Sequence, residues 1–427
     1  MNLAFQSMKV ISLKKIEFFL MRFLIFDIIF LGPMGIKIWG SISERHLLLG
    51  LSFAFSVIFL LKRKSFSLIA IYPLLGAVFY FLIWGFIIPL LKQGNFSSSV
   101  EEIKPVIYFL FIFSALRLRN TSRIETIRKD LILWSAILGV IVVTLWFKAN
   151  FSLETGYAYA LKLFYSILGG TSDGLYIGPM PDGSFRIFWI SCAIFPWSIL
   201  LLKRSDKLYF LASIFFLVAA FATGTRAVFY CAVIAFVVNF ITLASLKTKL
   251  VGFSACVVLI VVVLSYGLGV TETSRIFDIQ SVLKPDSARY IQAMSLLESL
   301  EGSEIFGSGF GASATVVRSE SASFSYELTY IALLMKTGLL GIIYVTGLLY
   351  LIHYSINNSI RHRMIKVSSN SSVYVSLLFF FMLTFTNPYL FTIHGLTLFV
   401  CLIVAASNKF FAHANNKNRN DLAHRAF

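Results

Sequence analysis

The most constraining feature of this chain is a succession of apolar runs, many about 20 residues long, separated by polar segments. A helix of about 20 mostly apolar residues is long enough to cross the roughly 30 Å hydrocarbon core of a bilayer. Only 13% of the 427 residues are charged and the mean hydropathy is +0.83, whereas a soluble domain carries about 25% charge. These values exclude a cytosolic enzyme, a secreted disulfide scaffold and a disordered chain. We therefore predict an all-α polytopic membrane protein.

About twelve transmembrane helices are expected from the length and spacing of the apolar runs. The candidate spans are 16–38, 46–61, 66–91, 103–116, 130–149, 185–202, 207–223, 227–246, 250–270, 325–352, 372–387 and 390–408. Residues 1–408 then form a single transmembrane domain. The polar, Asn-rich residues 409–427 are expected to form a disordered tail.

The basic residues predict the orientation of these spans. With the N-terminus inside, the cytoplasmic segments hold 23 of the 37 lysines and arginines, whereas 5 acidic residues lie inside and 13 outside. Short loops rich in lysine and arginine stay in the cytoplasm. Both termini are therefore expected to be cytoplasmic. Basic loops against an anionic leaflet also explain the net charge of +17 without a nucleic-acid partner.

The remaining polar material lies in two long outer loops, residues 150–184 and 271–324. The inner loops are short and no GxxxxGK[ST] motif is present, so any chemistry is expected on the outer side and without a nucleotide. Four cysteines lie inside apolar runs with neither disulfide nor metal-ligand spacing. No metal site and no cofactor are therefore predicted. The cysteines are Cys192, Cys231, Cys256 and Cys401.

The loop 271–324 carries the first candidate site residue. Its sequence SARYIQAMSLLESL, from residue 287, has apolar residues at intervals of three and four, which predicts an amphipathic helix lying on the membrane surface. Arg289 falls in the first turn, where a guanidinium and unpaired helix N–H groups both attract an anion such as phosphate. An arginine that only touches lipid headgroups is the alternative.

A glycine-rich stretch, GSEIFGSGFGAS, follows at residues 302–313. Glycine allows a backbone to approach a ligand closely, but it also marks ordinary loops. Because no strand precedes the stretch and no βαβ unit surrounds it, a dinucleotide-binding motif is rejected. We expect an ordinary loop.

Arg226 is a second candidate, in the outer hairpin Thr223-Gly224-Thr225-Arg226 between spans seven and eight. An arginine at this depth is costly unless it faces water or a cavity inside the bundle. The alternative is an arginine that extends its charged end to the membrane surface.

Glu327 opens the tenth span, residues 325–352. At 1.5 Å per residue this span measures about 42 Å, more than the bilayer core. Its first turns are therefore expected to rise into the outer headgroups, where a sheltered carboxylate can act as a base. The alternative is a carboxylate that only favours the helix dipole. Lys336 is expected to pair with Asp27 or to serve a ligand. Asp27 and Arg22 are expected to form a structural ion pair within the membrane or to lie at an interface, and not to be catalytic.

Three of these stretches, taken in order, resemble the O-antigen polymerase and O-antigen ligase superfamily of bacterial envelope polysaccharide assembly. TGTRA at 223–227 is similar to an arginine motif at the start of a span. Residues 287–311 resemble a loop arginine followed by glycines, and ELTYIALLMKTGLLG at 327–341 resembles a helix closing in Gly-Leu-Leu-Gly. The resemblance covers mainly 207–345. The ligases have a histidine where this chain has Glu327, which favours a polymerase.

The resemblance implies a metal-independent membrane glycosyltransferase in the bacterial inner membrane. It would act at the periplasmic face, transferring a polyprenyl-diphosphate-linked oligosaccharide onto a second lipid-linked repeat unit. The implied catalytic residues are Glu327, Arg226 and Arg289. The residues expected to bind the substrate are Arg226, Arg289, Arg318 and Lys336. A flippase and a chain-length regulator of the same pathway are the implied protein partners.

Three other functions remain open at this point. An O-antigen ligase would need a lipid A core acceptor, and a twelve-span flippase would move the lipid-linked oligosaccharide. The uneven distribution of polar segments disfavours a transporter built from related halves. A scaffold in the assembly complex would do neither.

Overall fold

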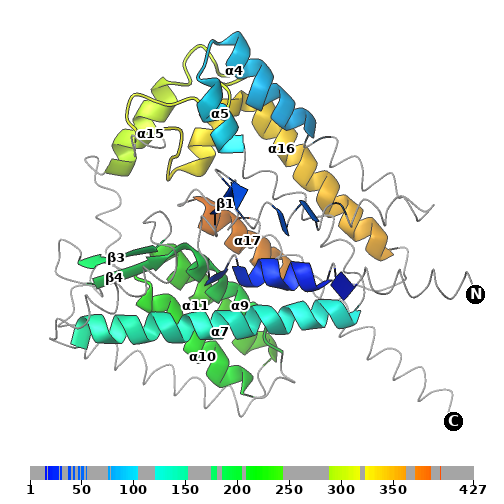
Figure 1. Ribbon diagram of the computed structural model, residues 1–427, viewed down its shortest axis with the longest axis vertical. Coiled ribbons are helices and arrows are strands. Elements are labelled where there is room, and N and C mark those ends of the chain that lie inside the picture. The colour runs from blue at the N-terminus through cyan, green and yellow to red at the C-terminus, as the bar shows by residue number, and fades with distance from the viewer. Residues whose placement is uncertain are drawn as a thin grey trace, which may run out of the picture.

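Figure 1 shows the computed structural model of the chain, which is predominantly helical. The structure describes residues 15–16, 18–27, 29–30, 37–39, 42–43, 47–48, 50–51, 54, 76, 78–103, 121–151, 175–179, 185–203, 208–243, 288–317, 323–361, 371–385 and 395. Within these residues the helices form two groups, which we call the helical bundle and the loop assembly.

The helical bundle lies in the lower half of Figure 1 and shares one apolar core. Its helices are α7 (Thr121–Phe151), α9 (Phe195–Leu201), α10 (Tyr209–Ala222), α11 (Arg226–Leu243) and α17 (Ser371–Phe385). Leu131, Leu138, Val142 and Leu145 form a buried stripe along α7, at the spacing that places side chains on one face of a helix. Met21, Leu24, Ile25 and Ile29, near the start of the described chain, belong to the same core.

The loop assembly lies in the upper half of Figure 1. Its elements are the π-helical turn η1 (Ile83–Ile87), α4 (Ile88–Leu91), α5 (Phe96–Ile103), α15 (Ala288–Glu298) and α16 (Thr329–Arg361). Two small apolar clusters hold these elements together, around Trp84 with Phe310 and around Leu296 with Tyr326. The two groups contact each other at the start of α16, where the Tyr330 hydroxyl lies 2.5 Å from the Thr384 hydroxyl of α17.

Two antiparallel hairpins depart from the all-α prediction. Strand β1 (Lys37–Trp39) pairs with β2 (Ile42–Ser43), so the first predicted span cannot continue as a helix to residue 38. Strand β3 (Leu175–Pro179) pairs with β4 (Phe185–Trp189), followed by the 3-10 turn η3 (Ile190–Ile194) and α9. The predicted span 185–202 is therefore wrong as a single helix.

Two of the described helices are long and apolar enough to cross a membrane, Glu125–Phe147 and Thr329–Gly347. Five shorter apolar helices accompany them in the described part of the chain: Val78–Leu91, Ser191–Leu201, Tyr209–Ala222, Arg226–Ile241 and Val375–Thr384. The predicted spans 250–270 and 390–408 lie wholly or almost wholly outside the described residues, as do most of 46–61 and 103–116, and the tail 409–427 lies wholly outside them. The count of twelve stays a prediction.

The tenth predicted span is interrupted. Helix α16 contains a non-helical residue, Gly338, with φ 61° and ψ −173°, so the helix runs in two parts on either side of it. The expectation of one continuous 42 Å helix is wrong here, because a glycine with positive φ cannot continue the right-handed helix.

Candidate functional site

The glycine-rich loop, residues 302–311, inserts its backbone into the break in α16. The N–H groups of Ser308 and Gly309 donate to the carbonyls of Met335 and Lys336, at 3.0 and 2.7 Å. In return, the carbonyls of Glu304 and Ile305 accept from the N–H groups of Leu339 and Leu340, at 2.8 and 3.1 Å. A break in a helix frees such backbone groups, and leaving them unpaired in an apolar setting is costly. The loop pairs them.

Only glycine fits at this contact, because there is no space for a Cβ atom and because the backbone has a positive φ. Gly307 has φ +72°, and a Cβ there would lie 2.3 Å from the carbonyl carbon of Lys336. A Cβ on Gly338 would lie 2.3 Å from the carbonyl oxygen of Ile305. The glycines therefore permit a close approach, as one interpretation of the sequence held, but the approach is to the protein's own backbone.

The other side of the loop contacts the π-helical turn η1. Pro89 has no N–H group, so the carbonyls of Trp84 and Gly85 lose the partner that a π or α turn would give them. The Phe310 N–H donates to Trp84 O at 2.8 Å, and the Ser99 hydroxyl donates to Gly85 O at 2.6 Å. Segments more than 200 residues apart thus complete each other's backbone hydrogen bonds.

Lys336 is buried beneath this loop and forms an ion pair with Glu102 of α5. Its ammonium also donates to the Phe324 carbonyl at 2.6 Å and lies 5.6 Å from the centre of the Tyr326 ring. Glu102 accepts a second hydrogen bond from Gly311 N–H at 2.7 Å. The expected pairing of Lys336 with Asp27 is wrong, and Glu102 was not predicted. Nothing in the sequence around Glu102 indicates that its partner lies 234 positions away.

Arg289 and Glu327, two of the predicted catalytic residues, lie together. The Arg289 Nε atom is 3.1 Å from Glu327 Oε2, with side chains 47% and 26% exposed. Arg289 stands in the first turn of α15 and Glu327 stands two residues before α16. The pair therefore joins the two segments at a position that solvent or a ligand can reach.

Helix α15 presents its apolar face outward. Tyr290, Ile291, Met294 and Leu297 are exposed, whereas Gln292, Ser295 and Leu296 are buried. The Ser295 hydroxyl accepts a hydrogen bond from Val316 N–H at 3.0 Å, which holds the segment around Val316 against α15. The predicted amphipathic helix is present, and its apolar side faces away from the protein.

Arg226 is the first residue of α11 and is half-buried in the helical bundle. It follows a tight hairpin in which Gly224, at φ 61°, ends helix α10. Helix α11 packs against α17, which in turn contacts the start of α16. The fourth predicted basic residue, Arg318, lies outside the described residues.

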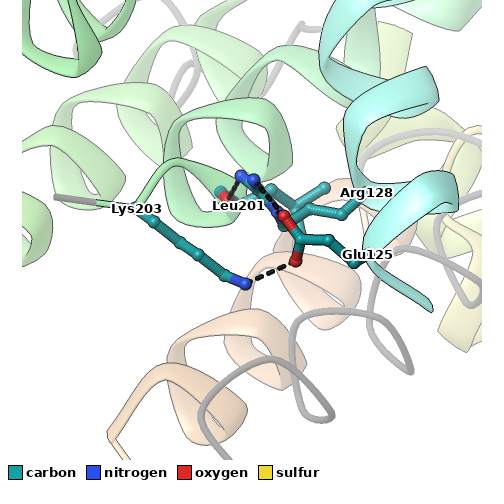
Figure 2. Close-up of polar contacts among 4 residues, drawn as sticks. All are labelled: Glu125, Arg128, Leu201 and Lys203. Carbon is teal, nitrogen blue, oxygen red and sulfur yellow. Dashed lines mark hydrogen bonds and ion pairs between the residues drawn. The ribbon is translucent and has the colours of Figure 1, made fainter. Parts of the chain in front are cut away.

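A second charged cluster lies at the predicted cytoplasmic end of α7, as Figure 2 shows. Glu125 accepts from Arg128 Nη2 at 2.6 Å and from Lys203 Nζ at 2.5 Å. The buried Arg128 also donates from Nη1 to the carbonyl of Leu201, the last residue of α9, at 2.9 Å. The sequence assigns the segments around 125 and 203 to the same side, and their contact agrees with that assignment.

Arg22 has a different partner from the predicted one. Its Nε lies 2.5 Å from Asp130 Oδ2 and its Nη2 lies 2.9 Å from Asp130 Oδ1. The pairing of Arg22 with Asp27 is therefore wrong. Asp130 gives the guanidinium a two-point contact between two helices, whereas Arg22 and Asp27, five residues apart, are not neighbours on one helix face.

No group of three or more potential metal ligands occurs among the residues that the structure describes. Searches for similarity to known protein families, to curated proteins and to solved structures find no match to this chain.

Proposed function

We propose that this protein is a membrane glycosyltransferase that polymerises lipid-linked oligosaccharide repeat units, as an O-antigen polymerase does. The observation that carries the proposal is the accessible Arg289–Glu327 pair. It combines an anion-binding group with a carboxylate, next to the start of a helix long enough to cross a membrane. A cationic side chain suits a diphosphate leaving group, and a carboxylate suits an acceptor with a hydroxyl nucleophile.

In the proposed reaction the acceptor hydroxyl oxygen attacks the anomeric carbon of the donor sugar. The bond from that carbon to the diphosphate oxygen breaks, and polyprenyl diphosphate leaves with the bonding electrons. Arg289 stabilises the negative charge that develops on the leaving group. Glu327 accepts the proton of the attacking hydroxyl. Arg226 is proposed as a second cation for the diphosphate.

The resting ion pair has a specific role in this proposal. A bound diphosphate carries more negative charge than one carboxylate and competes with Glu327 for the Arg289 guanidinium. Transfer of Arg289 to the diphosphate would release Glu327 toward the acceptor. The donor would thus prepare the base for the second substrate. Lys336, with its ammonium already held by Glu102 and Phe324 O, is better suited to supporting the site than to binding substrate.

Complementation of a polymerase-null strain tests the proposal. Arg226→Ala, Arg289→Ala and Glu327→Ala should each leave only glycolipid with a single repeat unit. Glu298→Ala is the matched control, since Glu298 is an exposed carboxylate on the same helix as Arg289 and should leave long chains. Long chains from all three site variants would refute the assignment.

A transporter for the same lipid-linked oligosaccharide is the second candidate. It is favoured by the break in α16 and the buried Lys336–Glu102 pair, because transporters bind their substrates at interrupted helices. Against it, the backbone groups at this break bond to the glycine-rich loop and are not left for a substrate. Liposomes loaded with a purified lipid-linked repeat unit separate the two: a polymerase elongates the glycan, whereas a flippase only moves it.

The proposed setting is the periplasmic face of the bacterial inner membrane, with a flippase and a chain-length regulator as partners. The proposal is supported by contacts between segments assigned to the same side. Residues 92–102 and the loop 271–324 are both predicted to be outside, and they meet through Glu102 and Gly311. A ligase stays the alternative within the enzyme class, and an added lipid A core acceptor would reveal it.

A further inference from the structure

The tip of the glycine-rich loop is apolar and exposed, although much of the backbone around it is hydrogen-bonded to other parts of the protein. Ile305 and Phe306 are 59% and 53% exposed. On a loop surrounded by water, two adjacent large apolar side chains in this state are unfavourable. Some apolar medium or partner is therefore expected to cover them.

Most backbone groups of the loop are hydrogen-bonded to protein, whereas the N–H groups of Ile305 and Phe306 donate to no group in the described part of the chain. The four successive carbonyls of residues 303–306 accept from Gly307 N–H, Leu339 N–H, Leu340 N–H and Trp84 Nε1. The next four N–H groups, of residues 307–310, donate to carbonyls of the loop, α16 and η1. Non-helical backbone is tolerated at membrane depth when protein satisfies it in this way.

The exposed tip is continuous with an exposed face of α16. Ile305 and Leu340 are joined through their backbones, and Leu339 and Ile343, beyond the break, are 57% and 58% exposed. This part of α16 belongs to the segment Thr329–Gly347, which is long and apolar enough to cross a membrane. The medium that covers Leu339 and Ile343 therefore also reaches Ile305.

Charged groups mark the boundary of the apolar tip. Lys92 Nζ donates to the Ser303 hydroxyl, and Glu304 accepts from Gly302 N–H at 2.9 Å. Hydrogen bonds from its own backbone N–H and from Gly302 hold the pKa of the exposed Glu304 carboxyl below its usual range. A carboxylate that stays charged requires water or headgroups beside it. The change from Glu304 to Ile305 is thus a change from polar to apolar surroundings.

We propose that residues 302–311 form a re-entrant loop whose tip, Ile305 and Phe306, is immersed in the acyl chains of the bilayer beside the break in α16. The loop then belongs to the membrane domain and does not lie on the protein surface in water. It fixes the depth of the segments on either side of it, with Arg289 before the loop and Glu327 after it, relative to the lipid headgroups. The inference depends on the chain being a membrane protein and not on which reaction it catalyses.

Cysteine accessibility in the full-length protein tests the immersion. Ile305→Cys and Ser313→Cys place a thiol at the tip and at an exposed polar position of the same segment. The probe is a membrane-impermeant maleimide with a mass tag, applied to membranes opened by freezing and thawing so that both faces are reached. Tags are counted relative to the unmodified protein, which carries the four native cysteines. Ile305→Cys should react at least about tenfold more slowly than Ser313→Cys, because hydrocarbon suppresses the thiolate and excludes the reagent. Both should react fully in SDS.

A photo-crosslinking residue at Phe306 identifies what covers the tip and does not depend on the cysteine variants. p-Benzoylphenylalanine at position 306 should crosslink to phospholipid. Equal labelling rates at positions 305 and 313, or a crosslink from position 306 to a protein in place of lipid, would overturn the proposal.

Discussion

The helical bundle and the loop assembly are stabilised in different ways. The bundle is a packed apolar core in which neighbouring helices meet through side chains such as Trp197 and Phe379. The loop assembly has smaller apolar clusters, and its irregular segments complete one another's backbone hydrogen bonds across more than 200 residues. Arg289 and Glu327, the two predicted catalytic residues that form an ion pair, both lie in the loop assembly. The difference suggests that the bundle provides stability while the loop assembly positions a site.

The largest effect is expected from removing one partner of the buried ion pair. Lys336→Met should lower the free energy of unfolding by about 3–5 kcal/mol, because it leaves the Glu102 carboxylate, only 13% exposed, without its cation. Denaturant titration in mixed micelles measures the loss. Adding Glu102→Gln should restore a large part of it. A cost below about 1 kcal/mol for Lys336→Met would show that the loop assembly does not depend on this pair.

Gly307→Ala should be almost as damaging. The new Cβ would meet the backbone of Lys336 at 2.3 Å, at a residue with φ +72°. Strain and overpacking together predict a cost of about 2–4 kcal/mol, measured by the same titration. Gly347→Ala is the control, since no atom lies within 4 Å of a Cβ there, and it should be neutral or slightly stabilising. Equal behaviour of the two variants would contradict the close backbone contact.

The elements of the two groups also show what the sequence can and cannot predict. Helices α10 and α11 fall within a few residues of the predicted spans 207–223 and 227–246, because an apolar run of suitable length is a local signal. The break at Gly338 and the Lys336–Glu102 pair depend on contacts with residues far along the chain, and no periodicity encodes them. The hairpin β3–β4 did have a local signal, Pro181-Asp182-Gly183 between its strands, which is typical of a turn. The apolar run after residue 185 concealed it.

The candidate site was predictable only in part. The sequence indicates Arg289 as a cation in the first turn of an amphipathic helix and Glu327 as a carboxylate at the start of a long span, and the structure brings the two to 3.1 Å. Neither residue's sequence neighbourhood specifies the other. The partners proposed for Arg22 and Lys336 were wrong for the same reason, since an ion pair between distant helices depends on how those helices pack.

An intermediate effect on stability is expected in the helical bundle, at the charged cluster around Glu125 of α7. Arg128→Met should cost about 1.5–3 kcal/mol, because Arg128 is buried and its guanidinium bonds both a carboxylate and the Leu201 carbonyl. Lys203→Met removes a partly exposed partner of the same carboxylate and should cost less than about 1 kcal/mol. Thermal unfolding of the two variants side by side measures the ratio. The reverse order of effects would mean that burial does not decide the contribution of each cation.

The smallest effect on stability is expected at the proposed site. Arg289→Ala breaks a largely exposed ion pair, so the free energy of unfolding should change by about 0–1 kcal/mol. Chain elongation should nevertheless be lost. A loss of several kcal/mol would indicate that the pair is structural, and the contrast with Lys336 would disappear.

A charge exchange at the pair tests the central claim most directly. The protein carrying both Arg289→Glu and Glu327→Arg is reconstituted in liposomes with a purified polyprenyl-diphosphate-linked repeat unit, and glycan length is measured beside the single variants and the unmodified protein. We predict that the exchanged protein folds normally and makes no chains, because the cation and the base have left the positions where leaving group and acceptor need them. Chains of normal length from the exchanged protein would show that only the mutual attraction of the two residues matters, and would contradict their proposed catalytic roles.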